Sequence, residues 1–407
     1  MTGAVSKRIG SLQGTVLPLL QFVTSSSYAG RIGENDIADF VFGNPHEMAL
    51  PEFADALKKA SEPQDKNWFA YKRSEPEATS VVAKTLREIH GLPFEDHHIF
   101  MTNGAFAALT VALSAICDPG DEVIFFSPPW FFYEALIVDK GATPVRVRVD
   151  ANTFDLDLAA VEAALTERTR AIIVNSPNNP TGKIYPDSTL RALGEMLTEA
   201  SKKNGRPIYL LSDEAYSRIV FDDKQFVSPA LYYDNSFLIY TYAKTLLTPG
   251  QRIGYIAISP AIQNLADITG ALFMAQTLTG WAFPNALLQH ALANIEGLSI
   301  DIGRLEARRD KMVGALRSYG YDVHSPEGTF YLLPRSPIPD DVAFTERLAT
   351  LGVFVLPGTV VEMPGYFRIS LTANDEMVER GLEGFRDAIG PRYRQGSEKP
   401  AHSMSVE

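Results

Sequence analysis

Between residues 98 and 260, short and almost wholly apolar segments alternate with stretches of helical spacing. Continuous hydrophobicity of this kind is typical of strands that are buried on both faces, as in mostly parallel sheets covered by helices. Helical spacing lies between them at 158–165 and 188–203. The pattern predicts an α/β fold, a three-layer domain built around a mostly parallel sheet. The expected strands are 123–126, 144–149, 171–175, 208–212, 237–241 and 255–259.

The last third of the chain has a different pattern, which indicates a second and smaller domain. A helical pattern runs from 285 to 319, with an expected break near Gly297. Short strand-like segments and a final helix follow at 328–333, 353–355, 367–371 and 376–389. A chain of 407 residues exceeds the usual size of one hydrophobic core. The expected division is a large domain at 44–290, a small α+β domain formed by an N-terminal arm (1–43) with 291–391, and a disordered tail at 392–407.

Charge and apolar runs narrow the expected partners. The net charge is −12 and no basic patch is evident, so nucleic acid is not an expected partner. No apolar run is long enough to cross a bilayer and no cleavage pattern follows the start, so we expect a cytoplasmic protein without membrane association. His97 and His98 are adjacent and would point apart in an extended segment. No metal-binding motif accompanies them, so we expect no metal site.

The segment Thr241-Tyr242-Ala243-Lys244 places a lysine at the end of an apolar strand, and Arg252 follows eight residues later. A desolvated amine near another cation loses its proton more readily than a solvated one and can then form a Schiff base with a carbonyl. The Thr241 hydroxyl and the Arg252 guanidinium are donors that suit a phosphate. Together they point to a phosphate-bearing aldehyde, pyridoxal 5′-phosphate, although a solvated lysine is the commoner interpretation of Lys244 alone.

Two turns at predicted strand ends offer further groups for such a cofactor. Gly104 precedes a helical stretch at 107–116, and a glycine at a helix start lets backbone amides approach a phosphate. Asn179 lies in the proline-rich turn 175–182, at the edge of the sheet where open α/β folds bind ligands. Taken singly, each segment also fits an ordinary turn.

Acidic and aromatic residues occupy two other strand ends. Asp213 follows the strand 208–212, where its carboxylate would hold a protonated pyridine nitrogen through a charge-assisted hydrogen bond. Tyr216, three residues later, would donate to the phenolic oxygen of the ring. Trp130 follows two prolines after the strand 123–126 and would form a rigid plate for a flat cofactor. The alternative interpretation of Asp213 is a solvated carboxylate in a loop, and that of Trp130 is a residue of the hydrophobic core.

In order and approximate spacing, these motifs resemble the class I/II aminotransferases of pyridoxal-phosphate fold type I, the family that includes aspartate aminotransferase. The resemblance covers roughly residues 35 to 390. Its matching residues are the turn 179–182, Asp213 with Tyr216, Lys244, Arg252, the strand 367–370 with Arg368, and the early glycine loop 43–45.

The resemblance implies a role for each matched residue. Lys244 forms the Schiff base with the cofactor and then shuttles the proton at the substrate α-carbon. Tyr71 matches a tyrosine that reaches the phosphate of the neighbouring subunit, which implies a homodimer with shared active sites. The other implied cofactor contacts are Gly104, Ala105, Phe106, Thr241 and Arg252 at the phosphate, Trp130 and Asp213 at the ring, and Asn179 and Tyr216 at its oxygen. The implied substrate contacts are Gly43, Asn179 and Arg368.

The expected activity is transfer of an amino group from an α-amino acid to a 2-oxo acid by a ping-pong mechanism. A lyase, synthase or oxidase reaction on the same fold is the alternative. A cofactor-binding regulator would need a DNA-binding domain, for which there is no room before Gly43. The segment 270–283 contains no lysine or arginine, which favours a neutral or aromatic amino donor unless Arg31 or Arg73 enters the site.

Overall fold

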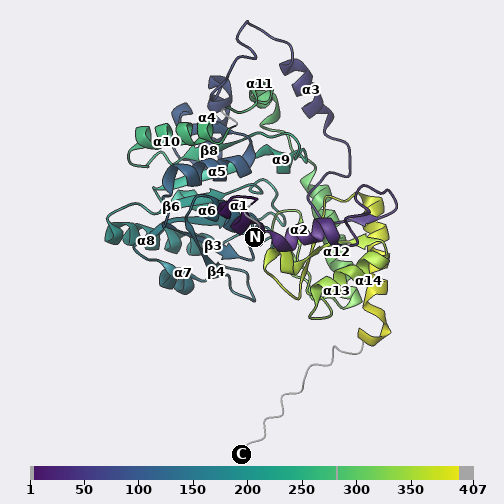
Figure 1. The fold of residues 1–407 in the computed structure, drawn as a ribbon. Coiled ribbons are helices and arrows are strands. Elements are labelled where there is room, and N and C mark those ends of the chain that lie inside the picture. Colours follow the sequence, from purple (N-terminus) through teal and green to yellow (C-terminus); the bar gives the residue numbers. More distant parts are fainter. Residues whose placement is uncertain (1–3, 281–282, 394–407) are drawn as a thin grey trace, which may run out of the picture.

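The computed structural model describes residues 4–280 and 283–393 and is centred on a seven-stranded sheet (Figure 1). Its strands are β2 (Ile99–Thr102), β3 (Glu122–Ser127), β4 (Thr143–Arg148), β5 (Thr169–Asn175), β6 (Tyr209–Asp213), β7 (Ser236–Thr241) and β8 (Gly254–Ile258). They lie in the order β2-β8-β7-β6-β5-β3-β4. Strands β4, β3, β5, β6 and β7 run parallel, whereas β8 is antiparallel to both of its neighbours. The predicted mostly parallel sheet is confirmed.

Helices cover both faces of this sheet because alternate strand residues point to opposite sides. Ile173 and Leu211 pack in a core cluster with the helices of one face, whereas Ile172 and Leu210 pack in a cluster on the other. The first face carries α5 (Gly104–Ile116), α6 (Tyr133–Asp139) and α10 (Leu265–Leu278). The second carries α3 (Pro51–Ala60), α4 (Pro76–His90), α7 (Leu158–Ala164), α8 (Asp187–Asn204) and α11 (Ala286–Ile295).

A second group of elements has its own sheets and its own core cluster. Its helices are α12 (Ile302–Tyr319), α13 (Asp341–Thr350) and α14 (Asp375–Tyr393). Its strands are β11 (Leu356–Pro357), β12 (Phe367–Ser370) and β9 (Tyr331–Leu332) in one sheet, and β1 (Ala38–Asp39) with β10 (Val353–Phe354) in another. This separation of sheets supports the division into a large domain at 44–290 and a small one at 1–43 with 291–391, which we propose.

Two sequence expectations meet the structure in this region. The helical pattern from 285 to 319 is interrupted as expected, since α11 ends at Ile295 and α12 begins after Asp301, whose side chain caps it by accepting from the Arg304 amide. Helix α14 extends to Tyr393, so the assignment of 392 and 393 to a disordered tail is wrong. The remainder of that predicted tail, 394–407, lies outside the described residues.

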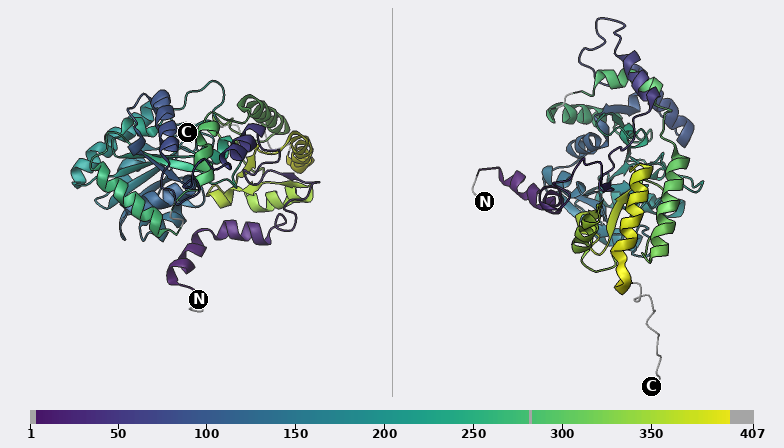
Figure 2. Two further views of the ribbon diagram at one scale, coloured as in Figure 1. Left: turned by 90° about the horizontal axis from the view of Figure 1, so that it is seen from above. Right: turned by 90° about the vertical axis from the view of Figure 1, so that its right-hand side faces the viewer.

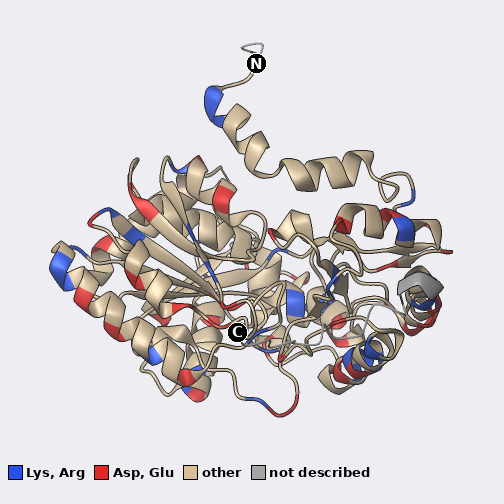
Figure 3. Ribbon diagram, turned by 90° about the horizontal axis from the view of Figure 1, so that it is seen from below, with Lys and Arg blue, Asp and Glu red and all other residues tan. Residues whose placement is uncertain are grey.

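The N-terminal arm consists of α1 (Lys7–Thr15) and α2 (Leu17–Ser25), which lie along the outside of the molecule (Figures 2 and 3). Leu19 and Phe22 anchor α2 in a small apolar cluster that also contains Phe354. The remaining short helices are η1 (Asp96–His98), η2 (Pro229–Tyr232) and η3 (Gly358–Val361). Across residues 4–280 and 283–393, no helix combines the length and apolar character needed to span a bilayer.

The expected opposite orientation of the two adjacent histidines is wrong. His97 and His98 belong to η1, a tight helical turn, and their ring centroids lie 4.0 Å apart. The His98 ring accepts a hydrogen bond from the Glu95 amide, at 2.9 Å, which closes this turn. The pair therefore has a local structural explanation.

Candidate active site

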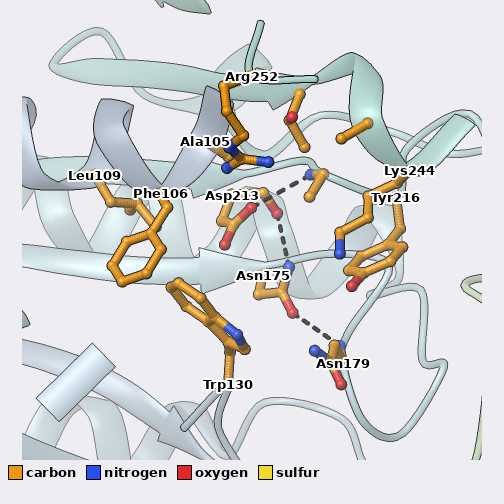
Figure 4. Close-up of a pocket in the computed structure, with 13 residues that line it drawn as sticks. Ala105, Phe106, Leu109, Trp130, Asn175, Asn179, Asp213, Tyr216, Lys244 and Arg252 are labelled. Carbon is orange, nitrogen blue, oxygen red and sulfur yellow. Dashed lines mark hydrogen bonds between the residues drawn. The ribbon is translucent and has the colours of Figure 1, made fainter. Parts of the chain in front are cut away.

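A cavity of about 220 Å³ lies at the carboxyl ends of β5, β6 and β7 (Figure 4). Parallel strands end at the same edge of a sheet, so side chains that follow them converge there. The residues that line the cavity are Ala105, Phe106, Leu109, Trp130, Asn175, Asn179, Asp213, Ala215, Tyr216, Thr241, Ala243, Lys244 and Arg252. Nine of the predicted site residues are therefore brought together, namely Ala105, Phe106, Trp130, Asn179, Asp213, Tyr216, Thr241, Lys244 and Arg252.

Lys244 lies in the one-turn helix α9 (Tyr242–Thr245), which begins directly after β7. Its neighbours Ala243 and Thr245 are buried and hold this turn in place, while the lysine itself is only partly buried. The amine Nζ lies 5.6 Å from the centroid of the Tyr216 ring and 5.8 Å from that of Phe330. An amine between two rings at the edge of a cavity is placed to meet a bound carbonyl.

Asp213 is the carboxylate at the floor of the cavity, and its side chain is buried. Burial raises the pKa of Asp213 above its ordinary value, while a hydrogen bond from Tyr133 and the charge of Lys244 lower it. The Tyr133 hydroxyl donates to Asp213 Oδ2 at 2.5 Å, and the Ala215 amide donates to Oδ1 at 3.3 Å. These donors favour the ionised carboxylate, the form that pairs with a protonated ring nitrogen.

Two asparagines connect Asp213 to the turn that follows β5. Asn175 donates from Nδ2 to the backbone oxygen of Asp213 at 2.9 Å, and its own side-chain oxygen accepts from the Asn179 amide at 2.8 Å (Figure 4). Both asparagines are buried. The side chain of Asn178 accepts from the Thr181 amide and hydroxyl, which closes the turn. The turn thus holds Asn179 at the sheet edge without using its side-chain oxygen.

Gly104, Thr241 and Arg252 form the part of the site that would receive a phosphate. Gly104 has a φ of +82° at the start of α5, and a Cβ atom there would lie 2.9 Å from Arg252 Nη2 and 3.3 Å from Thr241 Oγ1. Arg252 donates a hydrogen bond from Nη1 to the Pro249 oxygen at 2.8 Å. Among the described residues, no carboxylate pairs with Arg252. A guanidinium beside the N-terminus of a 13-residue helix suits an anion.

A group of aromatic side chains, here called the aromatic rim, consists of Phe106 and Trp130, which line the cavity, and of Phe131 and Phe132, which pack against them. The Phe106 ring lies 4.9 Å from Trp130 and 5.1 Å from Phe132, measured between centroids. Phe106 is 38% exposed, so its ring lies open at the edge. The rim presents apolar surface to whatever enters the site.

Arg368 and Gly43 do not line the cavity itself but connect to it. Arg368 lies in β12, is 1% exposed, and donates to Asn179 Oδ1 at 3.2 Å and to the Val41 oxygen at 3.0 Å. Its Nε atom has no hydrogen-bond partner among the described residues. A Cβ atom on Gly43 would lie 2.6 Å from the Phe330 ring. Both residues therefore reach the site from the small domain.

Tyr71 lies outside the cavity of its own chain. Its side chain is 94% exposed, and its ring lies 6.4 Å from that of Phe283. This placement leaves the hydroxyl available to another subunit and gives it no contact with its own phosphate site.

The comparisons with known proteins agree with this geometry. The family model for aminotransferase class I and II matches residues 35–385. The chain belongs to that family. A probable aspartate/prephenate aminotransferase of Thermus aquaticus is 32% identical over 87% of this chain and 92% of its own length. Two solved structures each match 95% of this chain. One is an amino transferase from Eubacterium rectale, and the other is a mutant of the aspartate aminotransferase from Thermus thermophilus. They cover 96% and 100% of their own chains, at 29% and 28% identity and TM-scores of 0.84 and 0.81.

This aminotransferase is an enzyme that uses pyridoxal 5′-phosphate, as members of its family do. The residues present fit that cofactor, because Gly104 leaves room beside Arg252, and Asp213 is held by donors that favour its ionised form. When bound, the cofactor supplies an electron sink for charge that develops at the substrate α-carbon.

Sequence reasoning missed several residues of the aminotransferase site. Asn175 ends β5 in the same way that Asp213 ends β6, so the strand-end argument could have found it. Tyr133 follows Trp130 by three residues, but nothing in the sequence shows that its hydroxyl meets Asp213. Phe330 and Tyr331 come from the other domain, and no local pattern indicates that they face Lys244 and Arg368.

Proposed function

We propose that this aminotransferase moves the amino group of a neutral or aromatic amino acid to a 2-oxo acid by a ping-pong mechanism. The donor leaves as a 2-oxo acid before the acceptor enters the same cavity. The donor class is supported chiefly by the aromatic rim, because Phe106 and Trp130 place apolar surface in the cavity that Lys244 also lines.

The distribution of positive charge supports the same donor class. In the described part of the chain, Lys244 and Arg252 are the basic residues that line the cavity, and both have proposed tasks at the cofactor. Arg31 pairs with Glu34 at 2.6 Å, and Arg73 lies 4.3 Å from the Phe273 ring. Neither arginine lines the cavity, so neither offers a cation for a second substrate carboxylate.

The absence of lysine and arginine from the segment 270–283 supports the proposed donor class less than the sequence suggested. Leu272 and Ala275 of α10 pack in the core of the large sheet, and no described residue of the segment lines the cavity of its own chain. Trp281 lies outside the described residues. The proposed donor class therefore depends on Phe106 and differs from the aspartate in the names of the relatives.

Each side chain has a proposed task that follows from its position. Lys244 holds the cofactor aldehyde and then carries the proton that leaves and rejoins the substrate α-carbon. Asp213 maintains negative charge at the ring nitrogen, and Tyr216 donates to the ring oxygen. The proposed phosphate contacts are Gly104, Ala105, Phe106, Thr241 and Arg252, with Tyr71 from a second subunit. Trp130 lies on the ring face, and Gly43, Asn179 and Arg368 bind the substrate carboxylate.

A donor panel tests this proposal. Purified protein is given phenylalanine, leucine or aspartate with pyruvate, an acceptor without a side-chain carboxylate, and alanine formation is followed. We expect kcat/KM for phenylalanine or leucine to exceed that for aspartate by about tenfold or more, since an unpaired carboxylate is costly against apolar rings. Double-reciprocal plots should be parallel. Phe106→Leu should lower kcat/KM for phenylalanine, whereas Phe69→Leu, at an exposed ring outside the cavity, should not.

The outcomes separate the parts of the proposal. Fastest turnover with aspartate would overturn the donor class and leave amino transfer intact. Ammonia release without alanine formation would contradict transfer, and intersecting plots would contradict the ping-pong order. Borohydride reduction followed by peptide mapping should label Lys244, and a label on another residue would overturn its role.

A further inference from the structure

Tyr331 is a buried aromatic residue that joins three parts of the site. It opens β9, and its register partner in β12 is Ser370, two residues beyond Arg368. Its side chain is 3% exposed. The guanidinium carbon of Arg368 lies 4.1 Å from the centroid of the Tyr331 ring, so the cation stacks on the ring face.

The stacking compensates the buried positive charge of Arg368. The arginine is 1% exposed, and none of the ion pairs among the described residues includes it. A buried cation needs some compensation, and an aromatic face provides it through the negative face of its quadrupole. A carboxylate partner would neutralise the guanidinium, whereas a ring leaves its charge and its unpartnered Nε free for a ligand.

The other end of Tyr331 lies among residues that approach the substrate. A Cβ atom on Gly43 would lie 2.9 Å from the Tyr331 hydroxyl. The rings of Tyr331 and Tyr216 are 6.0 Å apart at an interplanar angle of 72°. Burial raises the pKa of Tyr216 well above its ordinary value, and Tyr331 raises it further, while Arg368 lowers it. The three side chains thus interact electrostatically as one group.

The backbone before Tyr331 is held in an unusual conformation. Thr329 has a φ of +68°, which a β-branched residue rarely adopts. Its hydroxyl accepts a hydrogen bond from the Tyr331 amide at 3.1 Å, and its own amide donates to the Ile219 oxygen at 3.0 Å. Backbone strain of this kind persists where the surrounding structure requires it, and it gathers at functional sites. Here the Thr329 conformation fixes the direction in which the Tyr331 side chain projects from the start of β9.

We propose that Tyr331 is a positioning residue for amino transfer. Its ring holds the Arg368 guanidinium in the orientation that receives the substrate α-carboxylate, and its hydroxyl fixes Tyr216. The inference rests on the proposed roles of Arg368 and Tyr216. It adds Tyr331, a residue that none of the sequence motifs indicates.

Two substitutions separate the ring from the hydroxyl. Tyr331→Leu removes the stacking partner of Arg368, so binding of an unreactive carboxylate, 3-phenylpropionate, should weaken by about tenfold to thirtyfold, the factor that a desolvated cation–π contact represents. KM for the amino donor should rise in parallel. Tyr331→Phe keeps the ring, so it should leave 3-phenylpropionate binding within about threefold and lower kcat instead. Calorimetry of the holoenzyme measures this binding without turnover.

The matched control is Tyr366→Leu. Tyr366 stacks on Arg335 with 5.3 Å between guanidinium and centroid, and neither residue lines the cavity. Its loss should leave carboxylate binding and KM unchanged. Carboxylate binding by Tyr331→Leu equal to that of the control would overturn the role of the ring, and an unchanged kcat in Tyr331→Phe would overturn that of the hydroxyl. Should Tyr331→Leu fail to fold, the Tyr331→Phe result still decides the second point. Wild-type protein without turnover on any donor would instead overturn the proposed function.

Discussion

Asp213 and Glu214 are adjacent buried carboxyl groups whose side chains have different neighbours. The Asp213 carboxylate faces the cavity and accepts from Tyr133 at 2.5 Å. Glu214 is 1% exposed and accepts hydrogen bonds from Ser212 and Ser228. Burial raises the pKa of Glu214 to about 8, although the two serines lower it. One backbone step at a strand end therefore separates a group poised for a ligand from a group kept neutral in the core.

Glu214 predicts a pH dependence of stability. Its folded-state pKa of about 8 lies above its ordinary value of 4.5, so its stabilising contribution is complete below 4.5 and is lost as pH rises through about 8. Glu214→Gln removes this titration and keeps the shape of the neutral acid. The free energy of unfolding, measured by urea titration, should fall between pH 5 and pH 8 more in the wild type than in Glu214→Gln, by at most about 1.4 kcal/mol per pH unit.

The control for this experiment is Glu199→Gln. Glu199 is 74% exposed and pairs only with Lys202 one helical turn away. Its substitution should leave the pH profile like that of the wild type. Identical profiles for Glu214→Gln and the wild type would show that Glu214 is ionised throughout this range.

At the scale of elements, the turn between β2 and α5 shows how a helix end becomes an anion site. The glycine at this turn is required both by its φ of +82° and by the closeness of Arg252. Other residues reach left-handed backbone at a cost of roughly 1–2 kcal/mol. The helix thus begins where its free amides, Thr241 and Arg252 converge.

Gly104→Ala should therefore weaken binding of pyridoxal 5′-phosphate. The added methyl group meets Arg252 Nη2 at 2.9 Å, so the guanidinium must move as the backbone strains. We expect the Kd, followed by the absorbance of the bound cofactor, to rise about tenfold or more. Gly205→Ala is the matched control, because Gly205 has a φ of +64° and no atom within 4 Å of the added Cβ. It should lower stability and leave the Kd unchanged; equal Kd values in both variants would contradict the proposed phosphate site.

At the scale of the whole molecule, a set of exposed apolar side chains is consistent with the proposed homodimer. Tyr71 is 94% exposed, and Leu278 and Met274 of α10 are 78% and 52% exposed. Large apolar groups of this kind gather at interaction sites. In the proposed homodimer, a second copy of the chain covers this surface, and the Tyr71 hydroxyl reaches the phosphate site of that copy.

Subunit mixing tests whether Tyr71 acts on the neighbouring site. Tyr71→Ala and Lys244→Ala should each have little activity alone. In a mixed dimer, the Lys244 of one subunit would meet the Tyr71 of the other, which restores one complete site. Random exchange of equal amounts should give about one quarter of the wild-type sites, since half of the dimers are mixed and each contains one such site. No recovery after verified exchange would mean that Tyr71 does not act across the interface.

Much of this arrangement could be predicted because its determinants are local. Apolar runs predicted the strands, and the polar residues after them, such as Asn179, Asp213 and Lys244, had to gather because parallel strands end at one edge. The glycine at a helix start predicted a phosphate site by the same local reasoning.

The tertiary structure decided what lies against these groups. Tyr133 meets Asp213 across α6 and β6, and Tyr331 meets Arg368 through pairing of β9 with β12. Neither contact has a sequence spacing that predicts it, because each depends on how separate elements pack. The sequence determined the reacting groups and the edge where they gather. The fold decided which buried neighbours hold their charges, since desolvation and ring contacts arise only between segments that packing brings together.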